Sequence, residues 1–356
     1  MHGSAFILGG TGQIGRAVAR RLAETGWEVT TGHRGEFDPG EGNAAGIRRV
    51  RVDRHRTGEL EAALSSAVDV LIDVIPYTAE DAEQLLSLSG RVGSLVGVSS
   101  ASVYCDDEGR TIDEATDEAA FPRFPVPIPE DQATVPPGEE TYSRQKAAME
   151  QTLLGRSSVP ATIVRPCAVH GRGARHAREW YFLKRALDRR PAFLHAYRGE
   201  TIFHPTSVAN LAELVRLACE RPGTRILNCG DPDPPSVVQI GRAVAATVGY
   251  DPVDVLIPGS PPRPNVGESP WTAPRSMLLD MTRADTELGY RPLTTYEDAV
   301  GETCAWLLEA TRERDWKAAL PDLARYPVDL FDYAAEDGYL SGLTSTLVSG
   351  ETTNRR

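Results

Sequence analysis

A glycine-rich turn near the start of the chain constrains the fold more than any other feature of the sequence. The turn is spaced G-x-x-G-x-x-G and lies between an apolar segment at residues 5–8 and a helical pattern at residues 13–22. Glycine lets the chain reverse tightly and lets backbone N–H groups approach a pyrophosphate, which rests at the positive end of the helix. A strand–turn–helix is the context that such a motif requires. The expected dinucleotide contacts are Gly9, Gly12, Gln13, Ile14 and Gly15.

Further apolar, β-branched segments alternate with helical stretches along the first half of the chain. This alternation predicts an α/β fold with a Rossmann-type, doubly wound parallel sheet, in which ligands bind at the carboxyl ends of the strands. The 356 residues, of which 41% are hydrophobic, suffice for such a domain and a smaller C-terminal substrate-binding domain. The expected strands lie at residues 5–8, 27–31, 49–53, 68–75 and 94–98.

The motifs also predict the domain organisation. Residues 1–171 are expected to form mainly a dinucleotide-binding Rossmann domain, with an acidic, proline-rich insertion at 105–141. An irregular insertion of that length is either a functional lid or a solvated loop. The other expected parts are a substrate-binding portion at 172–205 and 251–280, returning segments at 206–250 and 281–310, a C-terminal extension at 311–343 and a flexible tail at 344–356.

Charge and cysteine content exclude several classes of partner. The net charge of −12 argues against nucleic acid, because phosphate binding needs a basic surface. No apolar run reaches 18 residues, so no membrane span is expected, and the early first strand leaves no room for a signal peptide. Five scattered cysteines without a C-x-x-C pair predict free thiols, a cytoplasmic protein and no metal site. The apolar residues of 311–343 are expected to pack on the rest of the chain or on a second subunit, so a homodimer is possible.

The end of the expected second strand bears on the choice of cofactor. The fold normally places an acidic residue there, which accepts a hydrogen bond from the adenosine ribose. This chain has His33 and Arg34 instead, and a guanidinium suits a 2′-phosphate. We therefore expect NADP(H), with NAD as the alternative. Asp53, at the end of the third strand, either accepts from the adenine amino group or caps the following turn.

A tyrosine and a lysine stand four residues apart at the start of a predicted helix. Tyr142 and Lys146 therefore share one helix face, and with only three lysines in the chain such a pair is rarely a coincidence. The ammonium favours the phenolate and lowers a pKa that starts near 10. Tyr142 is then expected to exchange a proton with a carbonyl or alcohol oxygen that the Ser100 hydroxyl holds, while hydride moves to or from a nicotinamide.

With these motifs the chain resembles the short-chain dehydrogenase/reductase superfamily, in its extended, NAD(P)-dependent epimerase/dehydratase-like branch. The resemblance covers roughly residues 5 to 310 and implies that Ser100, Tyr142 and Lys146 carry catalysis. It also implies cofactor contacts beyond the glycine turn, at Asp53, Pro76 and Pro166. The segments that carry the resemblance are the glycine turn, residues 99–104, residues 142–146, residues 163–171, residues 203–209 and residues 288–292.

Two departures from the family pattern narrow the expected reaction. Enzymes of this branch that dehydrate nucleotide sugars carry an Asp-Glu pair directly after the catalytic serine or threonine, where this chain has Ala101 and Ser102. A dehydratase is therefore disfavoured. Ala168 stands where the sugar-nucleotide enzymes usually have an asparagine near the substrate diphosphate, which weakens a nucleotide-sugar assignment without excluding it.

The sequence thus predicts an NADP(H)-dependent oxidoreductase that reduces a ketone, or oxidises a secondary alcohol, on a sugar-like or natural-product substrate. A nucleotide-sugar epimerase with tightly bound NAD(P) is the alternative, and a non-catalytic binding member of the fold is the second. Aromatic and cationic side chains suit a polar ring-containing ligand. The residues expected to bind substrate are Ser102, His170, Trp180, Arg198 and Arg263.

Overall fold

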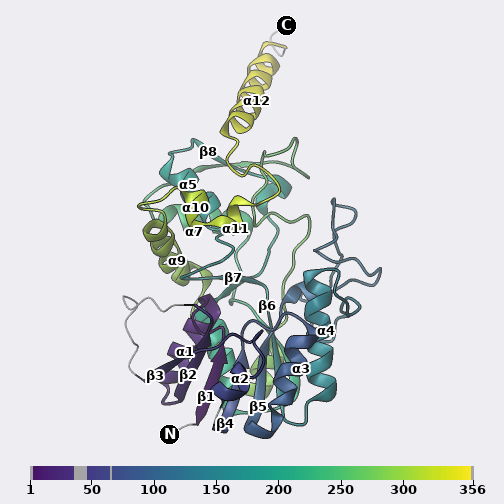
Figure 1. Cartoon of the computed structure of the whole chain (residues 1–356). Helices are drawn as coiled ribbons and strands as arrows, with labels where there is room; N and C mark the ends of the chain where they lie inside the picture. The colour runs from purple at the N-terminus through teal and green to yellow at the C-terminus, as the bar shows by residue number, and fades with distance from the viewer. Residues whose placement is uncertain (1–2, 36–45, 65, 354–356) are drawn as a thin grey trace. The chain divides into compact units, whose positions relative to one another are not determined.

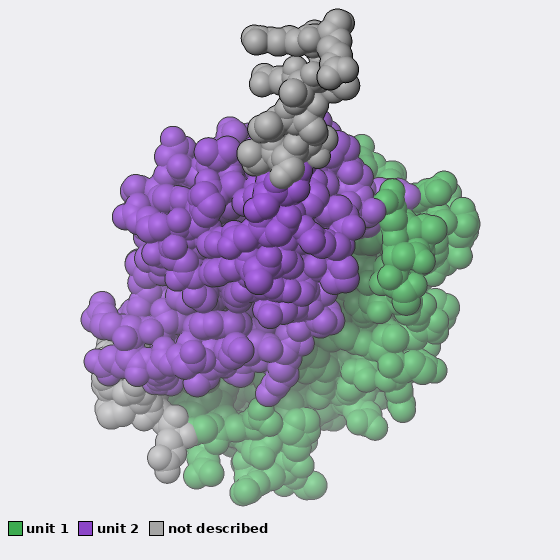
Figure 2. Space-filling model, turned by 90° about the horizontal axis from the view of Figure 1, so that it is seen from above, with its two compact units in different colours: residues 1–173, 204–234, 277–299 green, residues 174–203, 235–276, 300–356 purple. Residues whose placement is uncertain are grey.

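A computed structural model describes residues 3–35, 46–64 and 66–353 of the chain. The chain divides into two compact units, coloured separately in Figure 2. Unit 1 comprises residues 1–173, 204–234 and 277–299, and unit 2 comprises residues 174–203, 235–276 and 300–356.

Unit 1 is built on a parallel seven-stranded sheet with the order β10-β6-β5-β4-β1-β2-β3 (Figure 1). The order reverses between β1 and β4, and a doubly wound sheet of this kind binds its ligands beside that point, at the carboxyl ends of the strands. The sheet confirms the predicted Rossmann-type fold class. Its strands are β1 (Ser4–Leu8), β2 (Glu28–His33), β3 (Ile47–Arg51), β4 (Val68–Asp73), β5 (Val92–Val98), β6 (Ala161–Pro166) and β10 (Arg225–Cys229).

Helices cover both faces of the sheet, which explains why its inner strands β1 and β5 are largely apolar. On one face α1 (Gln13–Glu24) packs with α6 (Val208–Glu220), and on the other α3 (Ala79–Ser87) packs with α4 (Tyr142–Arg156). Successive side chains of a strand point to opposite faces. Accordingly, Ile7 of β1 joins the core under α1 and α6, whereas Phe6 and Leu8 join the core under α3 and α4.

Smaller elements complete unit 1. A short parallel pair joins β7 (Ala168–His170) to β9 (Pro205–Ser207). The 3₁₀ helix η2 (Ala101–Val103) follows β5 and packs against α4. The others are α2 (Glu59–Ala63), η1 (Ser89–Arg91), α8 (Thr282–Leu288) and the start of α9 (Tyr296–Ala310).

The insertion at 105–141 contains no helix or strand, in agreement with its expected irregularity, but its acidic residues anchor it to unit 1. A Glu130 carboxylate oxygen accepts a hydrogen bond from the Asn228 backbone N–H in β10, at 3.0 Å. Asp113 accepts two hydrogen bonds from Ser143, at the start of α4. These contacts, of which the Glu130–Asn228 hydrogen bond is buried, argue against a purely solvated loop.

Unit 2 contains most of the predicted substrate-binding portion, together with residues 235–250 and 300–356. A parallel two-stranded sheet pairs β8 with β11. The last helix continues through Thr353, where the sequence predicts a flexible tail from 344, and residues 354–356 lie outside the described residues. The elements of unit 2 are α5 (Trp180–Leu187), β8 (Ala192–His195), η3 (Ala196–Gly199), α7 (Val237–Ala246), β11 (Val253–Leu256), α10 (Trp316–Ala319), α11 (Pro321–Ala324) and α12 (Tyr333–Thr353).

Three further observations concern the described residues only. None of their helices is long and apolar enough to cross a membrane. No group of three or more potential metal ligands occurs among them. All five cysteines are free thiols.

Candidate active site

The three expected catalytic residues belong to two neighbouring elements of unit 1. Ser100 follows β5 directly, and Tyr142 and Lys146 lie in the first two turns of α4. The start of α4 is well defined, because the Thr141 side chain accepts a hydrogen bond from the Arg144 N–H and Asp113 holds Ser143. The predicted helix therefore begins at the tyrosine itself.

The Lys146 side chain is only 3% exposed, and its ammonium bonds to backbone carbonyls at the carboxyl edge of the sheet. Nζ donates to the Pro76 oxygen and to the Val98 oxygen, both at 2.9 Å. Burial lowers the pKa of Lys146 to about 8, although the nearby carboxylates of Asp73 and Glu150 act in the opposite direction. The lysine is therefore a cation that can lose its proton within the range of ordinary assays.

Two phenol rings lie beside this ammonium. Nζ is 4.7 Å from the ring centroid of Tyr77 and 5.8 Å from that of Tyr142, and the two centroids are 6.2 Å apart. The structure thus brings the predicted tyrosine–lysine pair to one place, with the ammonium over the ring of Tyr142. Tyr77 was not among the predicted site residues. Its position four residues after the end of β4, at the same sheet edge as Ser100, was the available signal.

Serine hydroxyls cluster at the end of β5. Ser100 Oγ accepts a hydrogen bond from the Ser102 N–H at 3.1 Å and so caps η2. The Ser99 and Ser102 hydroxyls are buried and have no hydrogen-bond partner among the described residues. An unsatisfied buried hydroxyl costs about 1–3 kcal/mol. The free hydroxyl of Ser102 fits its expected role as a polar contact for substrate.

The glycine turn has the geometry expected of a pyrophosphate site. A Cβ at Gly15 would lie 2.3 Å from the Gly9 oxygen, so glycine is needed there for α1 to pack on the turn. A Cβ at Gly12 would find no protein atom nearer than 3.4 Å, so packing does not explain that glycine. Gly12 is the N-cap of α1, which has no side-chain cap. Gln13 Nε2 donates to the Gly171 oxygen at 3.4 Å, and Ile14 packs on the core.

The strand ends nearest the turn carry basic side chains. Arg34 is exposed directly after β2, and Arg51 pairs in register with His33, whose Nδ1 lies 2.9 Å from the Gly35 oxygen. The sequence left two roles open for Asp53, and the structure shows the turn cap. Its Oδ1 accepts a hydrogen bond from the His55 N–H at 3.1 Å. Residues 36–45, which follow this edge, lie outside the described residues.

Two predicted contacts occupy buried positions in unit 1. Pro166 is the last residue of β6, and Pro76 contributes its carbonyl to Lys146. His170 is 1% exposed, its Nε2 is 2.6 Å from the Asp231 carboxylate, and its ring lies 4.9 Å from that of Tyr296. These contacts place His170 in the core of unit 1, and its contact with substrate stays a prediction.

The other three predicted substrate residues belong to unit 2. Trp180 is buried within α5, and its contact with substrate stays a prediction. Arg198 is exposed and pairs with Glu200 at 2.8 Å. The Arg263 guanidinium lies 5.7 Å from the Tyr339 ring centroid.

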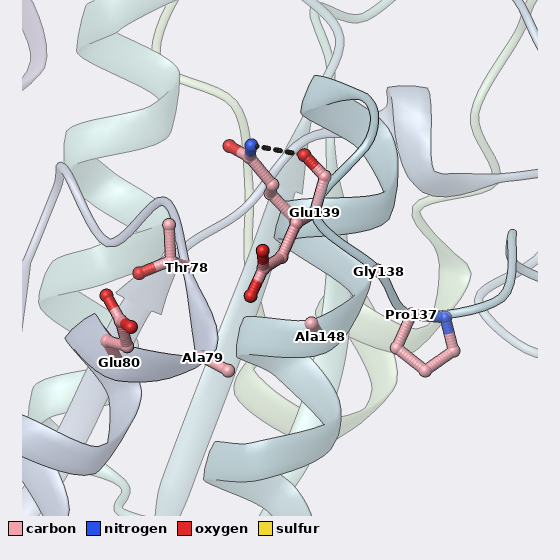
Figure 3. A pocket seen from close by; sticks show the side chains of 8 residues that line it. Thr78, Ala79, Glu80, Pro137, Gly138, Glu139 and Ala148 are labelled. Carbon is pink, nitrogen blue, oxygen red and sulfur yellow. Dashed lines mark hydrogen bonds between the residues drawn. The ribbon is translucent and has the colours of Figure 1, made fainter.

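A pocket of about 530 Å³ lies on another flank of α4 (Figure 3). It is lined by the start of α3, by residues 137–139 of the insertion, and by Gln145 and Ala148 of α4. Gln145 Nε2 donates to the Glu139 oxygen at 2.8 Å, the dashed contact in Figure 3. None of the predicted site residues lines this pocket.

Comparisons with known proteins concern the family and the fold. The family model described as the NAD dependent epimerase/dehydratase family matches residues 5–230. Among solved structures, the chain is similar to the Bordetella bronchiseptica enzyme WbmG in complex with NAD and UDP, with 20% identity and a TM-score of 0.64 over 87% of this chain and 95% of that one.

Two further structures show the same likeness. A UDP-galactose 4-epimerase is 21% identical, with a TM-score of 0.62 over 86% of this chain and 99% of that one. The dTDP-glucose 4,6-dehydratase of Bacillus anthracis, in complex with NAD, is 14% identical, with a TM-score of 0.64 over 87% and 98%. At these identities the likeness establishes the shared fold.

Proposed function

Because the chain belongs to the NAD-dependent epimerase/dehydratase family, we propose that it exchanges hydride between NADP(H) and a carbon–oxygen centre of a sugar-like or natural-product substrate. The family makes the chain an enzyme and confirms the predicted resemblance, so the non-catalytic alternative is set aside. The proposal adds the reaction, the preference for NADP(H) and the catalytic residues Ser100, Tyr142 and Lys146.

One observation carries the proposal, namely a buried ammonium beside the ring of Tyr142 with no carboxylate hydrogen-bonded to it among the described residues. A positive charge at this place favours the phenolate over the phenol. In the reducing direction Tyr142 gives its hydroxyl proton to the carbonyl oxygen, and in the oxidising direction it takes the proton of the alcohol. Ser100 lies two residues after the carbonyl that holds Lys146 and donates a hydrogen bond to the same substrate oxygen. The nicotinamide, when bound, supplies or accepts the hydride.

The chain's own residues fit such a cofactor. The N–H groups at the uncapped start of α1, beside the unexplained Gly12, suit a pyrophosphate. At the adenosine end, Arg34 follows β2 where the usual carboxylate would stand, and Arg51 of β3 pairs in register with His33, so that both guanidinium groups favour a 2′-phosphate. These side chains support NADP(H) over NAD.

An epimerase is the second candidate, and the similarity to UDP-galactose 4-epimerase favours it. It would use the same serine, tyrosine and lysine but would return the hydride to the carbon that lost it. A dehydratase remains disfavoured, because Ala101 and Ser102 supply no acid–base pair after Ser100.

The test is turnover of Tyr142→Phe against the wild type on ketone and nucleotide-sugar substrates. Loss of the proton donor should lower kcat by about 10²–10⁴-fold, while binding of NADPH, measured by fluorescence, is unchanged. Gln145→Ala, on the pocket flank of the same helix, is the matched control and should retain activity. Wild-type turnover in Tyr142→Phe would refute the mechanism. Net oxidation of NADPH indicates a reductase, and product formation without net oxidation indicates the epimerase.

A further inference from the structure

The ammonium of Lys146 has two kinds of neighbour, backbone carbonyls that accept hydrogen bonds from it and aromatic rings that lie beside it. An ammonium has three N–H donors. Within the described part of the chain, two hydrogen bonds are formed, to the Pro76 and Val98 carbonyls. Nζ also lies near the rings of Tyr77 and Tyr142, of which Tyr77 is closer by 1.1 Å.

The backbone around Tyr77 is held firmly, although its ring is 38% exposed. The Tyr77 N–H donates to a carboxylate oxygen of Asp81 at 2.7 Å, and the same carboxylate forms a capping box with Thr78 at the start of α3. The backbone that carries the ring is therefore anchored at the start of α3. Among the described residues, the ring lies beside the Lys146 ammonium and the Tyr142 ring.

Several charged groups face the same ammonium. The carboxylates of Asp73 in β4, Asp81 in α3 and Glu150 in α4 raise the pKa of Lys146, whereas burial and the Arg54 guanidinium lower it. Arg54 is itself paired with Asp73 and Asp81. An aromatic face is a neutral group that still attracts a cation, through its quadrupole, by about 0.5–2 kcal/mol.

We infer that Tyr77 is a positioning residue of the candidate active site, whose ring covers the Lys146 ammonium and holds the charge beside Tyr142. Tyr142 cannot be the constant aromatic partner of the ammonium, because in the proposed mechanism its own charge changes when it gives or takes the proton. The effect of Tyr77 on proton transfer by Tyr142 rests on the proposed function. The contact between the Tyr77 ring and the ammonium does not.

The contact is tested by titrating the lysines of the full chain by NMR, with ¹³C at the lysine Cε position. The chain has three lysines, so Lys184 and Lys317 serve as internal controls and are assigned with Lys184→Arg and Lys317→Arg. Tyr77→Phe keeps the ring, and Tyr77→Leu keeps apolar bulk without it. Tyr77→Leu should lower the Lys146 midpoint by roughly 0.5 to 1.5 pH units, and Tyr77→Phe should leave it unchanged. An unchanged midpoint in Tyr77→Leu, or an equal shift in Tyr77→Phe, would overturn the inference.

The positioning role is tested by the pH dependence of kcat/KM. The charge on Lys146 is lost as pH rises through about 8, so activity should fall on that basic limb. In Tyr77→Leu the limb should move to lower pH together with the NMR midpoint. A limb that stays in place while the midpoint moves would refute the positioning role. If the proposed function fails because Tyr142→Phe remains active, the NMR titration still decides the contact.

Discussion

Lys146 and Arg165, two of the buried cations of unit 1, lie in very different environments, and each is at most 3% exposed. Arg165 Nε and Nη2 donate to the two carboxylate oxygens of Glu150, at 3.0 and 2.5 Å. Lys146, one turn before Glu150 on α4, donates to two neutral carbonyls and faces two rings.

The electrostatic consequences are opposite. Burial alone would lower the pKa of Arg165, but its hydrogen bonds to Glu150 and the charge of that carboxylate outweigh burial and raise it. Burial dominates at Lys146 and lowers its pKa to about 8. A cation held by a carboxylate is a fixed charge that suits structure. A cation held by neutral groups can still influence a proton on its neighbour, which suits catalysis.

The largest effect is expected for Lys146→Met. Without the ammonium the Tyr142 phenol keeps its ordinary affinity for the proton, so kcat should fall by about 10²–10⁴-fold. The free energy of unfolding should fall by less than in Arg165→Met, because the substitution leaves two neutral carbonyls rather than a carboxylate without a partner. Steady-state kinetics and urea unfolding measure both quantities, with Lys184→Met as the control. Near-wild-type kcat, or a loss of stability comparable to that of a broken ion pair, would abolish the distinction between the two cations.

Arg165→Met should produce the converse result. The substitution leaves Glu150 buried without its partner, so the free energy of unfolding should fall by about 3–5 kcal/mol. The double variant Arg165→Met/Glu150→Leu should recover most of this loss, since neither charge is then buried alone. Urea unfolding at pH 7 provides the measurement. A loss no larger than that of an exposed ion pair, about 1 kcal/mol or less, would show that Arg165 is not a structural charge.

The smallest effect concerns a third kind of cation, the exposed Arg34 after β2. Arg34→Asp should lower the ratio of kcat/KM for NADPH to that for NADH by about 10–100-fold, because a charge-assisted hydrogen bond contributes about 1.5–3 kcal/mol. Arg20→Asp, an equal change of charge at an exposed position of α1, is the control. An unaffected ratio would place the cofactor's 2′-phosphate elsewhere.

Much of the fold follows from local patterns that a reader can see in the sequence. The apolar segments at 5–8, 68–75 and 94–98 coincide with β1, β4 and β5, because a strand buried on both faces needs a continuous apolar run. The glycine turn and the tyrosine–lysine pair were recognisable for the same reason, since each depends on spacing within a few residues.

The residues that surround Lys146 and His170 could not be predicted from local sequence patterns. Tyr77 and the carbonyls of Pro76 and Val98 meet Lys146 across separations of 48 residues or more, and nothing in local spacing indicates such a meeting. His170 was expected at the substrate because its chemistry suits binding, but its carboxylate partner, Asp231, lies 61 residues further on. Burial is a property of the packed chain, so a histidine in the core and one at a surface look alike in sequence.

By itself, then, the sequence determined the order of strands and helices, the turn at the start of α1 and the face that Tyr142 and Lys146 share, because short-range sterics and periodicity govern all three. Only the tertiary structure decided how far the pKa of Lys146 falls below its ordinary value. That property depends on whether a carboxylate or a neutral group meets the charge once water has been excluded, and folding brings those partners together from distant parts of the chain.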